Sequence, residues 1–425
     1  MRALAGIVKV SMKYMKLTDK QLRQVNAQVN RLVSSDSYFG ALYRAAGIRG
    51  VASQEEFEAL PFSDKGALRE AYPMGICAVP EEEVVRIHSS SGTTGKPVII
   101  PYTAKDVTDW GEMFARCYAT AGVTRADRVQ IAVAYGLWTA GSGFQAGAER
   151  LGAMTVPTGP GNTDKQLRMM QDMGTTVLAA TSSYALLLAE EVQRRGIRDK
   201  LALKKGIFGS ERWSRKMRDA ISGGLGIEMY DIYGLTEIYG PGIGISCAAD
   251  QGIHYWDDYI YIEVVDPVTG RPVPDGETGE LVITTLVKEG APLLRFRTHD
   301  ISSIIPGKCP CGLDYPRIDV IHGRSDDMFK VHGVNMFPRQ VEEILQQVDG
   351  VLSEYHIDIA RDEMGKDCMT LSVETAEGVA LDSVARHVRE LFKSRIGMTP
   401  IINLVPHGAL ARSEKKTGRV SDMRD

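Results

Sequence analysis

Five short apolar runs in the middle of the chain constrain its fold more than any other feature. Several of them are rich in β-branched residues, and intervals of helix length separate them, a pattern typical of buried strands in βα units. We therefore expect an α/β fold whose parallel sheet carries functional loops at the carboxyl ends of its strands. The runs, which begin at residue 128, are RVQIAVAYG, GAMTVPTG, TTVLAATSS, KKGIFGSE and GIEMYDIYG.

The regions on either side of these runs differ from them in pattern. Residues 17–60 carry apolar residues at helical spacing, whereas the segment after residue 250 is rich in strand-like runs broken by Pro, Asp and Gly. A chain of 425 residues exceeds the size of one hydrophobic core, so we expect at least two domains. Charge and glycine cluster around residue 324. We therefore predict a large N-terminal domain of residues 1–323, with a β-rich subdomain, and a small α+β C-terminal domain of residues 324–425.

Composition and charge exclude several classes of protein. The formal net charge of −4 provides no basic field for a nucleic acid. The N-terminal sequence MRALAGIVKVSMKYMKLTDKQ has apolar runs far shorter than a membrane span and lacks a cleavage pattern after a continuous apolar core. The six cysteines are too few to indicate a disulfide scaffold. We expect a cytoplasmic protein with no nucleic-acid or membrane partner.

The segment HSSSGTTGKPVIIPYT, residues 88–103, places hydroxyls and glycines directly before a lysine. It does not match the Walker pattern, because Gly92 and Gly95 are only three residues apart and a proline follows Lys96. The physics can still be the same, since glycines allow consecutive backbone N–H groups to point at an anion, and the hydroxyls and lysine add donors. An ordinary Ser/Gly turn between strands is the alternative for a single loop of this kind.

Four later segments accompany this loop, and the set identifies a family. In their order and spacing, the five segments resemble the signature motifs of the adenylate-forming superfamily of acyl-CoA synthetases and related ligases. The stretch LPFSDKGALREAYPMGICAVPEEEVVRIHSSSGTTGKPVIIPYT, with FGSERWS and CGLDYPRI, is similar to phenylacetate-CoA ligases, and the resemblance runs from about residue 57 to the C-terminus. The four later segments are YDIYGLTEIYG (230–240), LRFRTHDIS (294–302), HGRSDDMFKVHGVNMFPRQVEEI (322–344) and RSEKKTGRV (412–420).

The resemblance implies two half-reactions at one site. A carboxylate, of an aromatic acid of the phenylacetate type, attacks the α-phosphorus of ATP to give an acyl-adenylate and pyrophosphate. The thiol of coenzyme A then displaces AMP. The resemblance also implies Mg²⁺ and a homodimer. Two alternatives stay open: an adenylation enzyme that passes its acyl group to a carrier-protein phosphopantetheine, an amine or another acceptor, and a non-catalytic nucleotide-binding protein.

The resemblance also assigns a nucleotide site. Thr236 and Glu237 are predicted catalytic residues: Thr236 bonds a phosphate or adenylate oxygen, and Glu237 holds Mg²⁺, which prefers carboxylate and phosphate oxygens. Tyr233 is expected to stack near adenine. Asp300 is expected to accept hydrogen bonds from the ribose hydroxyls, with Arg324 adding donors. The predicted ATP- and AMP-binding residues are Ser89, Ser90, Ser91, Gly92, Thr93, Thr94, Gly95, Lys96, Gly209, Ser210, Glu211, Asp231, Tyr233, Gly234, Thr236, Asp300 and Arg324.

Other positions are expected to act in the change between half-reactions. Asp326 matches the hinge about which the C-terminal domain rotates, and Gly333 lies on the segment that would face the pantetheine arm of coenzyme A. Lys416 is a predicted catalytic residue, because a cation there would stabilise charge that develops during adenylation. Lys415 stands where relatives have glycine, so either lysine can enter the site, and a mobile basic tail is the further alternative. His299 also replaces a glycine that is common in relatives, which places an imidazole beside the nucleotide.

The acyl pocket is expected in AYGLWTAGSG, residues 134–143. By resemblance, Tyr135, Gly136, Trp138, Ala140 and Gly141 would shape a slot for a flat ring, since aromatic side chains offer apolar area with defined geometry. A buried strand end with a conventional core aromatic is the alternative interpretation.

Three cysteines and a histidine indicate a metal site. Cys309 and Cys311 are separated by one residue, too few for the usual zinc knuckle, so this pair alone predicts free thiols. Cys247 and His254 follow YGLTE and complete a set of three sulfurs and one imidazole, which suits a closed tetrahedral structural zinc. Members of the phenylacetate-CoA ligase group can carry such a set, so the resemblance supports Zn²⁺ here. The other three cysteines are expected to be buried small hydrophobes; they are Cys77, Cys117 and Cys368.

Overall fold

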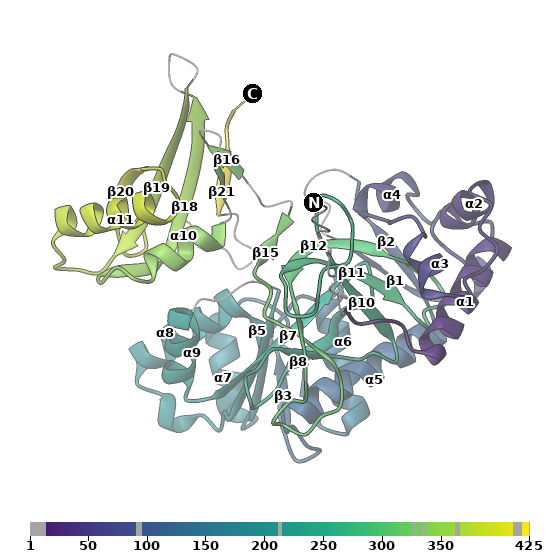
Figure 1. Cartoon of the computed structure of the whole chain (residues 1–425). Coiled ribbons are helices and arrows are strands. Elements are labelled where there is room, and N and C mark those ends of the chain that lie inside the picture. Colours follow the sequence, from purple (N-terminus) through teal and green to yellow (C-terminus); the bar gives the residue numbers. More distant parts are fainter. Residues whose placement is uncertain are drawn as a thin grey trace, which may run out of the picture.

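The computed structural model describes residues 14–424, with gaps at residues 91–95, 211–214, 326–328, 332–333, 337, 362–365 and 411–418. The described residues form a large N-terminal body and a smaller C-terminal domain that is set apart from it (Figure 1). Two hydrophobic clusters fill the N-terminal body, and a third contains only residues after 328. No helix in the described part of the chain is long and apolar enough to span a membrane.

Helices open the N-terminal body, as predicted for residues 17–60. The first begins at a capping box, in which the side chain of Thr18 accepts from the N–H of Gln21 and the Gln21 side chain accepts from the N–H of Thr18. It then buries one face, with Val25, Val29 and Leu32, in the largest hydrophobic cluster. The four helices of this region are α1 (Asp19–Ser34), α2 (Tyr38–Ala45), α3 (Gln54–Glu58) and α4 (Lys65–Glu70).

All five apolar runs are strands of one nine-stranded sheet, which confirms the predicted α/β core. Strands β4, β3, β5, β6 and β7 lie in this spatial order and pair in parallel, whereas β8, β9, β14 and β13 continue the sheet in antiparallel pairs. The strands are β3 (Arg128–Ile131), β4 (Met154–Val156), β5 (Val177–Thr181), β6 (Lys205–Gly209), β7 (Glu228–Leu235), β8 (Gly240–Ser246), β9 (Ile253–Tyr255), β13 (Ile304–Ile305) and β14 (Arg317–Ile318).

Helices cover both faces of this sheet (Figure 1). Alternate side chains of β5 show the division, because Val177 and Ala179 join the cluster of α5 and α6, whereas Leu178 and Ala180 join that of α7, α8 and α9. With both faces enclosed, the loops at the strand ends are the parts of the sheet that can meet a ligand. The helices are α5 (Ala104–Thr120), α6 (Ala140–Leu151), α7 (Thr163–Asp172), α8 (Ser182–Arg195) and α9 (Arg215–Leu225).

A four-stranded antiparallel sheet contains much of the β-rich region predicted after residue 250, whereas β9, β13 and β14 join the nine-stranded sheet. A buried ion pair ties the four-stranded sheet to the N-terminal helices: Arg295 lies 2.9 Å from Glu263, both side chains are at most 4% exposed, and the guanidinium also donates to the carbonyls of Glu58 and Leu60. The sheet order is β10 (Ile260–Val265), β11 (Gly279–Thr285), β12 (Phe296–Ser302) and β15 (Gly323–Arg324), and a separate hairpin joins β1 (Val84–Ser89) to β2 (Ile99–Thr103).

The C-terminal domain is α+β, as predicted. Its main sheet has the order β20–β19–β18–β21, and β15 ends at Arg324, beside the predicted domain boundary. The ammonium of Lys216 on α9 donates to the carbonyl of Val351, which links the two bodies. The elements are β16 (Phe329–Val331), β17 (Val334–Met336), α10 (Pro338–Leu345), β18 (Val351–Arg361), β19 (Asp367–Thr375), α11 (Leu381–Arg395), β20 (Ile401–Pro406) and β21 (Val420–Asp422).

The three cysteines predicted to be buried divide into two groups. Cys117 on α5 is fully buried, as expected. The prediction is wrong for Cys77 and Cys368, which are only partly buried. Cys77 lies in the loop after α4, where its thiol donates to the carbonyl of Val79 at 3.3 Å. Cys368 is the second residue of β19 and pairs with Ala360, near the end of the ladder where the chain passes from β18 to β19. Neither position is enclosed by a hydrophobic cluster.

Candidate active site

The β1–β2 hairpin presents the predicted phosphate loop. Ser90 closes its base, because its N–H donates to the carbonyl of Val98 at 3.0 Å and its hydroxyl oxygen accepts from the N–H of Val98 at 3.1 Å. The Ser89 hydroxyl donates to the carbonyl of Ser90 at 3.0 Å. Beyond the loop, the ammonium of Lys96 lies 5.6 Å from the ring centre of Tyr72. Ser90 and Val98 are therefore paired at the end of the hairpin.

The predicted acyl-pocket segment, residues 134–143, is joined to this hairpin through its first half. Both Ser89 and His88 contact the carbonyl of Leu137, at 2.8 Å from the Ser89 nitrogen and 3.2 Å from Nδ1 of His88. Burial, aided by nearby Arg86, lowers the pKa of His88 to about 4, so a neutral ring donates here. The loop follows β3 and runs into α6, at the carboxyl edge of the parallel strands.

Small residues shape the same loop. Gly141 lies against Tyr135, because a Cβ at this glycine would be 2.8 Å from the tyrosine ring. Gly136 has a φ of +99°, which a residue with a side chain rarely adopts. Ala140 is the first residue of α6, and Trp138 is partly buried against the largest hydrophobic cluster. The five predicted pocket residues thus lie together on one turn.

Tyr233, Asp300 and Arg324 converge from three strands. The Tyr233 hydroxyl donates to Oδ2 of Asp300 at 2.8 Å, and the Arg324 guanidinium donates to Oδ1 at 3.1 Å. Burial, reinforced by the Asp300 charge, raises the pKa of Tyr233 well above its ordinary value, so the hydroxyl keeps its proton. A carboxylate oxygen can accept more than one hydrogen bond, so Asp300 is an acceptor of the type that hydroxyl groups require. The cluster is suited to a ligand with paired hydroxyls.

Glycines bring the strands of this region close together. A Cβ at Gly234 would lie 2.1 Å from the carbonyl oxygen of Gly240, and one at Gly209 would lie 2.5 Å from the carbonyl oxygen of Ile232. Ser210 follows β6 in a left-handed conformation with a φ of +73°. The backbone N–H of Asp231 donates to the hydroxyl of Ser246 at 2.9 Å, which joins the middle of β7 to the end of β8.

Thr236 and Glu237 occupy that turn. Thr236 is partly buried, whereas Glu237 is 5% exposed. Oε1 of Glu237 lies 2.9 Å from the ammonium of Lys65 at the start of α4. Among the described residues this oxygen has no other polar partner. A buried carboxylate that faces one half-exposed ammonium is a position where a metal cation can replace the ammonium.

Lys288 contacts the turn from β7 to β8 and was not predicted from the sequence as part of the site. It is fully buried, donates to the carbonyl of Ile238, and lies 4.3 and 4.6 Å from the ring centres of Tyr102 and Tyr239. Burial lowers its pKa to about 7, although the charges of Asp106 and Glu237 oppose the shift. Its only sequence signal is an isolated lysine inside the apolar stretch TTLVKEGAPLL.

The contact of Lys65 with the site was not predicted from the sequence either. It is the first residue of α4, after the N-cap Asp64, a place where a lysine commonly lies in solvent. No local pattern reveals that this end of α4 faces the turn after β7, because the two segments are far apart in the sequence.

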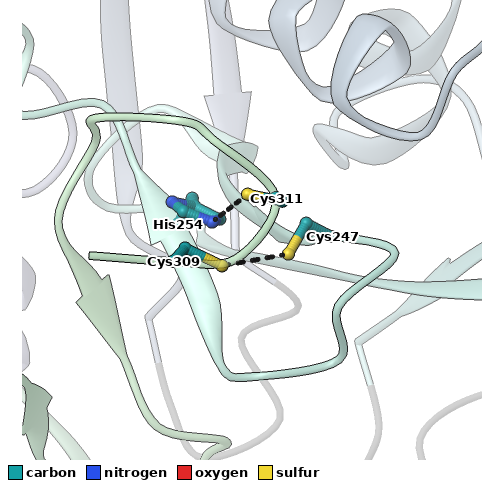
Figure 2. A group of neighbouring side chains, drawn as sticks. All are labelled: Cys247, His254, Cys309 and Cys311. Atoms are coloured by element: carbon teal, nitrogen blue, oxygen red, sulfur yellow. Dashed lines mark hydrogen bonds between the residues drawn. The ribbon is translucent and has the colours of Figure 1, made fainter. Parts of the chain in front are cut away.

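The predicted zinc ligands come together at the far edge of the sheet (Figure 2). Cys247 follows β8, His254 lies on β9, and Cys309 and Cys311 lie between β13 and β14; their ligand atoms are all within 4.8 Å of one another. Sγ of Cys247 is 3.6 Å from Sγ of Cys309, and Sγ of Cys311 is 3.3 Å from Nε2 of His254. Nδ1 of His254 donates to the carbonyl of Tyr315 at 3.0 Å. In the neutral ring, Nε2 then carries no proton and has the lone pair that a metal requires.

Several predicted site residues lie outside the described part of the chain, and their predictions stand as made. They are Ser91, Gly92, Thr93, Thr94, Gly95, Glu211, Asp326, Gly333, Lys415 and Lys416.

Both domains match family models. Residues 24–286 match the model described as AMP-binding enzyme, and residues 333–424 match the AMP-binding enzyme C-terminal domain. The first of these covers more than half of the chain. The protein is therefore an AMP-binding enzyme of the adenylate-forming superfamily.

Curated relatives narrow the assignment. A phenylacetate-coenzyme A ligase of Pseudomonas putida is 42% identical over 378 residues, which cover 87% of this chain and 85% of that protein. The protein of the same name from Thermus thermophilus is 38% identical over 96% of this chain and 96% of its own length. The one from Escherichia coli is 39% identical over 90% of this chain and 89% of its own length. The chain belongs to the phenylacetate-coenzyme A ligase family.

Solved structures agree with the fold. The chain superposes on 2-hydroxyisobutyryl-CoA ligase in the postadenylation state with a TM-score of 0.85, 28% identity, and coverage of 95% of this chain and 88% of that one. For the same ligase in the thioesterification state, the TM-score is 0.66, with coverage of 97% and 94%. The domain arrangement is thus more similar to the postadenylation state of that ligase.

Proposed function

We propose that the protein is an ATP-dependent, AMP-forming ligase that activates an aromatic carboxylic acid of the phenylacetate type and transfers its acyl group to coenzyme A. The observation that carries the proposal is the convergence of Tyr233, Asp300 and Arg324 beside the turn that holds Glu237, in a chain of this family. Asp300 would accept from both ribose hydroxyls, with Arg324 beside it as a donor.

Glu237 is the residue proposed to hold Mg²⁺. Mg²⁺ in phosphoryl-transfer sites is commonly bound by one or two carboxylates together with substrate phosphates, so a single buried carboxylate fits this use. The ion would neutralise phosphate charge during adenylation. Lys65, whose ammonium faces Oε1 of Glu237, would have to move aside, and the ammonium is exposed enough to do so.

Lys416 is proposed to enter the site for adenylation, with Asp326 as the hinge and Gly333 on the face that receives the pantetheine arm. The two neighbouring lysines provide a matched pair of variants. Lys416→Ala should suppress pyrophosphate exchange and spare thioester formation from supplied acyl-adenylate, whereas Lys415→Ala should change neither. The opposite result would assign the role to Lys415.

The acid is proposed to bind beside Tyr135, Gly136, Trp138, Ala140 and Gly141. The central experiment is ATP–pyrophosphate exchange with phenylacetate and a panel of aromatic and aliphatic acids, followed by an acceptor assay with coenzyme A. Exchange with aromatic acids and formation of the CoA thioester are expected. Exchange without thioester formation would favour a carrier-protein or amine acceptor, and absence of exchange with every acid would favour a non-catalytic nucleotide binder.

We also propose that Cys247, His254, Cys309 and Cys311 hold one structural Zn²⁺. A tetrahedral ion with Zn–S bonds of about 2.3 Å places its sulfurs about 3.8 Å apart, close to the 3.6 Å between Cys247 and Cys309. Such an ion would tie the end of β8 to the loop before β14 and leave no coordination position for substrate.

Metal analysis tests the zinc site without reference to activity. Purified protein should contain about one zinc per chain, and a chelator that removes it should lower the midpoint of thermal unfolding. Cys309→Ser should lose the metal, whereas Cys117→Ser, which changes a cysteine outside the cluster, should retain it. Metal-free protein with an unchanged unfolding midpoint in chelator would contradict the proposal. We propose a homodimer as well, which sedimentation velocity can test.

A further inference from the structure

His299 has a backbone conformation that a histidine rarely adopts. Its φ is +64°, in the left-handed region that disfavours residues with a Cβ. Among the described residues, only four other non-glycine positions share a positive φ. A strained residue persists where its surroundings compensate for the strain, and such residues cluster at functional sites.

The strain arises from a bulge in β12. Glu280 and Val282 of β11 pair with Ile301 and Arg297, so three residues of β12 face one residue of β11. The Thr298 hydroxyl fills the gap: it donates to the carbonyl of Leu281 at 2.8 Å and accepts from the N–H of Asp300 at 3.0 Å. The bulge re-aims the Asp300 side chain toward Tyr233 and Arg324. A glycine at position 299 would form this bulge without strain.

The polar contacts of His299 explain what the histidine adds. Its ring nitrogen Nδ1 lies 3.0 Å from the hydroxyl oxygen of Ser325, and its backbone N–H donates to Oε1 of Glu280 at 3.3 Å. The Ser325 hydroxyl also donates to Oε2 of Glu280 at 3.4 Å. Glu280 is fully buried and receives two hydrogen bonds from Arg297, at 3.0 and 2.6 Å. The carboxylate is therefore a fixed anchor for both His299 and Ser325.

Ser325 directly follows Arg324 at the end of β15. That strand has only two residues, and its register partner for Arg324 is Asp300. With so short a ladder, an anchor on the next residue helps to fix the direction of the Arg324 side chain, in addition to the hydrogen bond of Arg324 with Asp300. The only described side chains that contact the Ser325 hydroxyl are His299 and Glu280.

We propose that His299 is a positioning residue, which holds Ser325 so that Arg324 stays against Asp300 and the pair is ready for the ribose. The inference rests on the proposed nucleotide role of Asp300 and Arg324. It gives the imidazole a use that a glycine cannot supply, and thereby accounts for the strained backbone.

The test compares three single variants and one double variant with a matched control. His299→Gly relieves the backbone strain and removes the imidazole, so it should raise the unfolding midpoint by about 1–2 °C. It should also weaken AMP binding, measured by calorimetry, about fivefold, the scale of one hydrogen bond. Ser325→Ala should weaken AMP binding similarly, and the double variant should add little. His299→Asn, which tolerates the left-handed region and keeps a polar group, should restore part of the affinity.

Asn162→Gly is the control, because Asn162 has a φ of +53° at the start of α7 and no contact with this network. It should leave AMP affinity unchanged. In exchange assays, His299→Gly should raise the KM for ATP more than it lowers kcat. If His299→Gly and Ser325→Ala bind AMP as the unaltered protein does, His299 merely fills the turn and the proposal is overturned. Absence of acid-dependent exchange in the unaltered protein would instead contradict the proposed function, and AMP binding by the variants would still decide the role of His299.

Discussion

Two of the buried cations in the N-terminal body, Arg295 and Lys288, are held in opposite ways. Arg295, in the β-rich region, forms two hydrogen bonds with the buried carboxylate of Glu263, at 3.2 and 2.9 Å. Lys288, behind the candidate active site, reaches within the described residues only a carbonyl and two aromatic rings. The nearby carboxylate, Glu237, is left to the half-exposed Lys65. Arg295 is thus paired directly with a buried carboxylate, whereas Glu237, near Lys288, is paired with a more exposed ammonium that can move.

Breaking the ion pair between Arg295 and Glu263 should have the largest effect on stability. Arg295→Met leaves Glu263 buried without its partner, so the free energy of unfolding should fall by about 3–5 kcal/mol. Urea titration at pH 7 measures it. Arg194→Met is the control, because it breaks an exposed ion pair with Glu191 and should cause no measurable change. Equal stability of the two variants would mean that the buried pair adds nothing beyond a surface pair.

Replacing Glu237 should affect catalysis more than stability. Glu237→Gln keeps the shape of the side chain but removes the charge proposed to hold Mg²⁺, so acid-dependent pyrophosphate exchange should fall at least about 10²-fold. The unfolding midpoint should stay close to that of the unaltered protein. Exchange within twofold of the original rate, at the same Mg²⁺ concentration, would remove Glu237 from the metal site.

Lys288 predicts a smaller effect that depends on pH. Burial lowers its pKa to about 7 in the folded protein, whereas in the unfolded chain it is near 10.4. Between these values the unfolded state binds more protons, so the free energy of unfolding should rise with pH. Lys288→Met removes this rise. Between pH 7 and pH 9, the stability of the unaltered protein relative to the variant should increase by on the order of 1–2 kcal/mol; a constant difference would mean that Lys288 does not titrate in this range.

The sequence predicts the parallel core and the motif residues for a clear reason. Strand runs such as TTVLAATSS are buried on both faces, so their composition alone distinguishes them from surface elements. The grouping of Cys247, His254, Cys309 and Cys311 was likewise predicted, because three sulfurs and one imidazole form a recognisable ligand set that the family resemblance supports. What these patterns share is that the residue types themselves indicate the structure or the kind of ligand.

The contacts of Lys65, Lys288 and His299 could not be predicted in this way. Lys65 and Lys288 act through the turn at Glu237, which lies 172 and 51 residues away along the chain. The role of His299 depends on a bulge that no propensity encodes, although the departure from glycine marked the position. Tyr233 was expected to stack near adenine. The structure adds that its hydroxyl is hydrogen-bonded to Asp300, a contact that exists only because β7 and β12, from two different sheets, approach each other.

The single carbonyl of Leu137 has a consequence for protein engineering. Because it accepts from Ser89 and His88 on the hairpin, the loop proposed to select the acid and the loop proposed to grip ATP share one backbone anchor. Residues 134–143 are therefore not a cassette that can be exchanged alone between relatives. A graft intended to alter the preferred acid should carry the β1–β2 hairpin with it, and a graft without it should lose nucleotide affinity along with the old specificity.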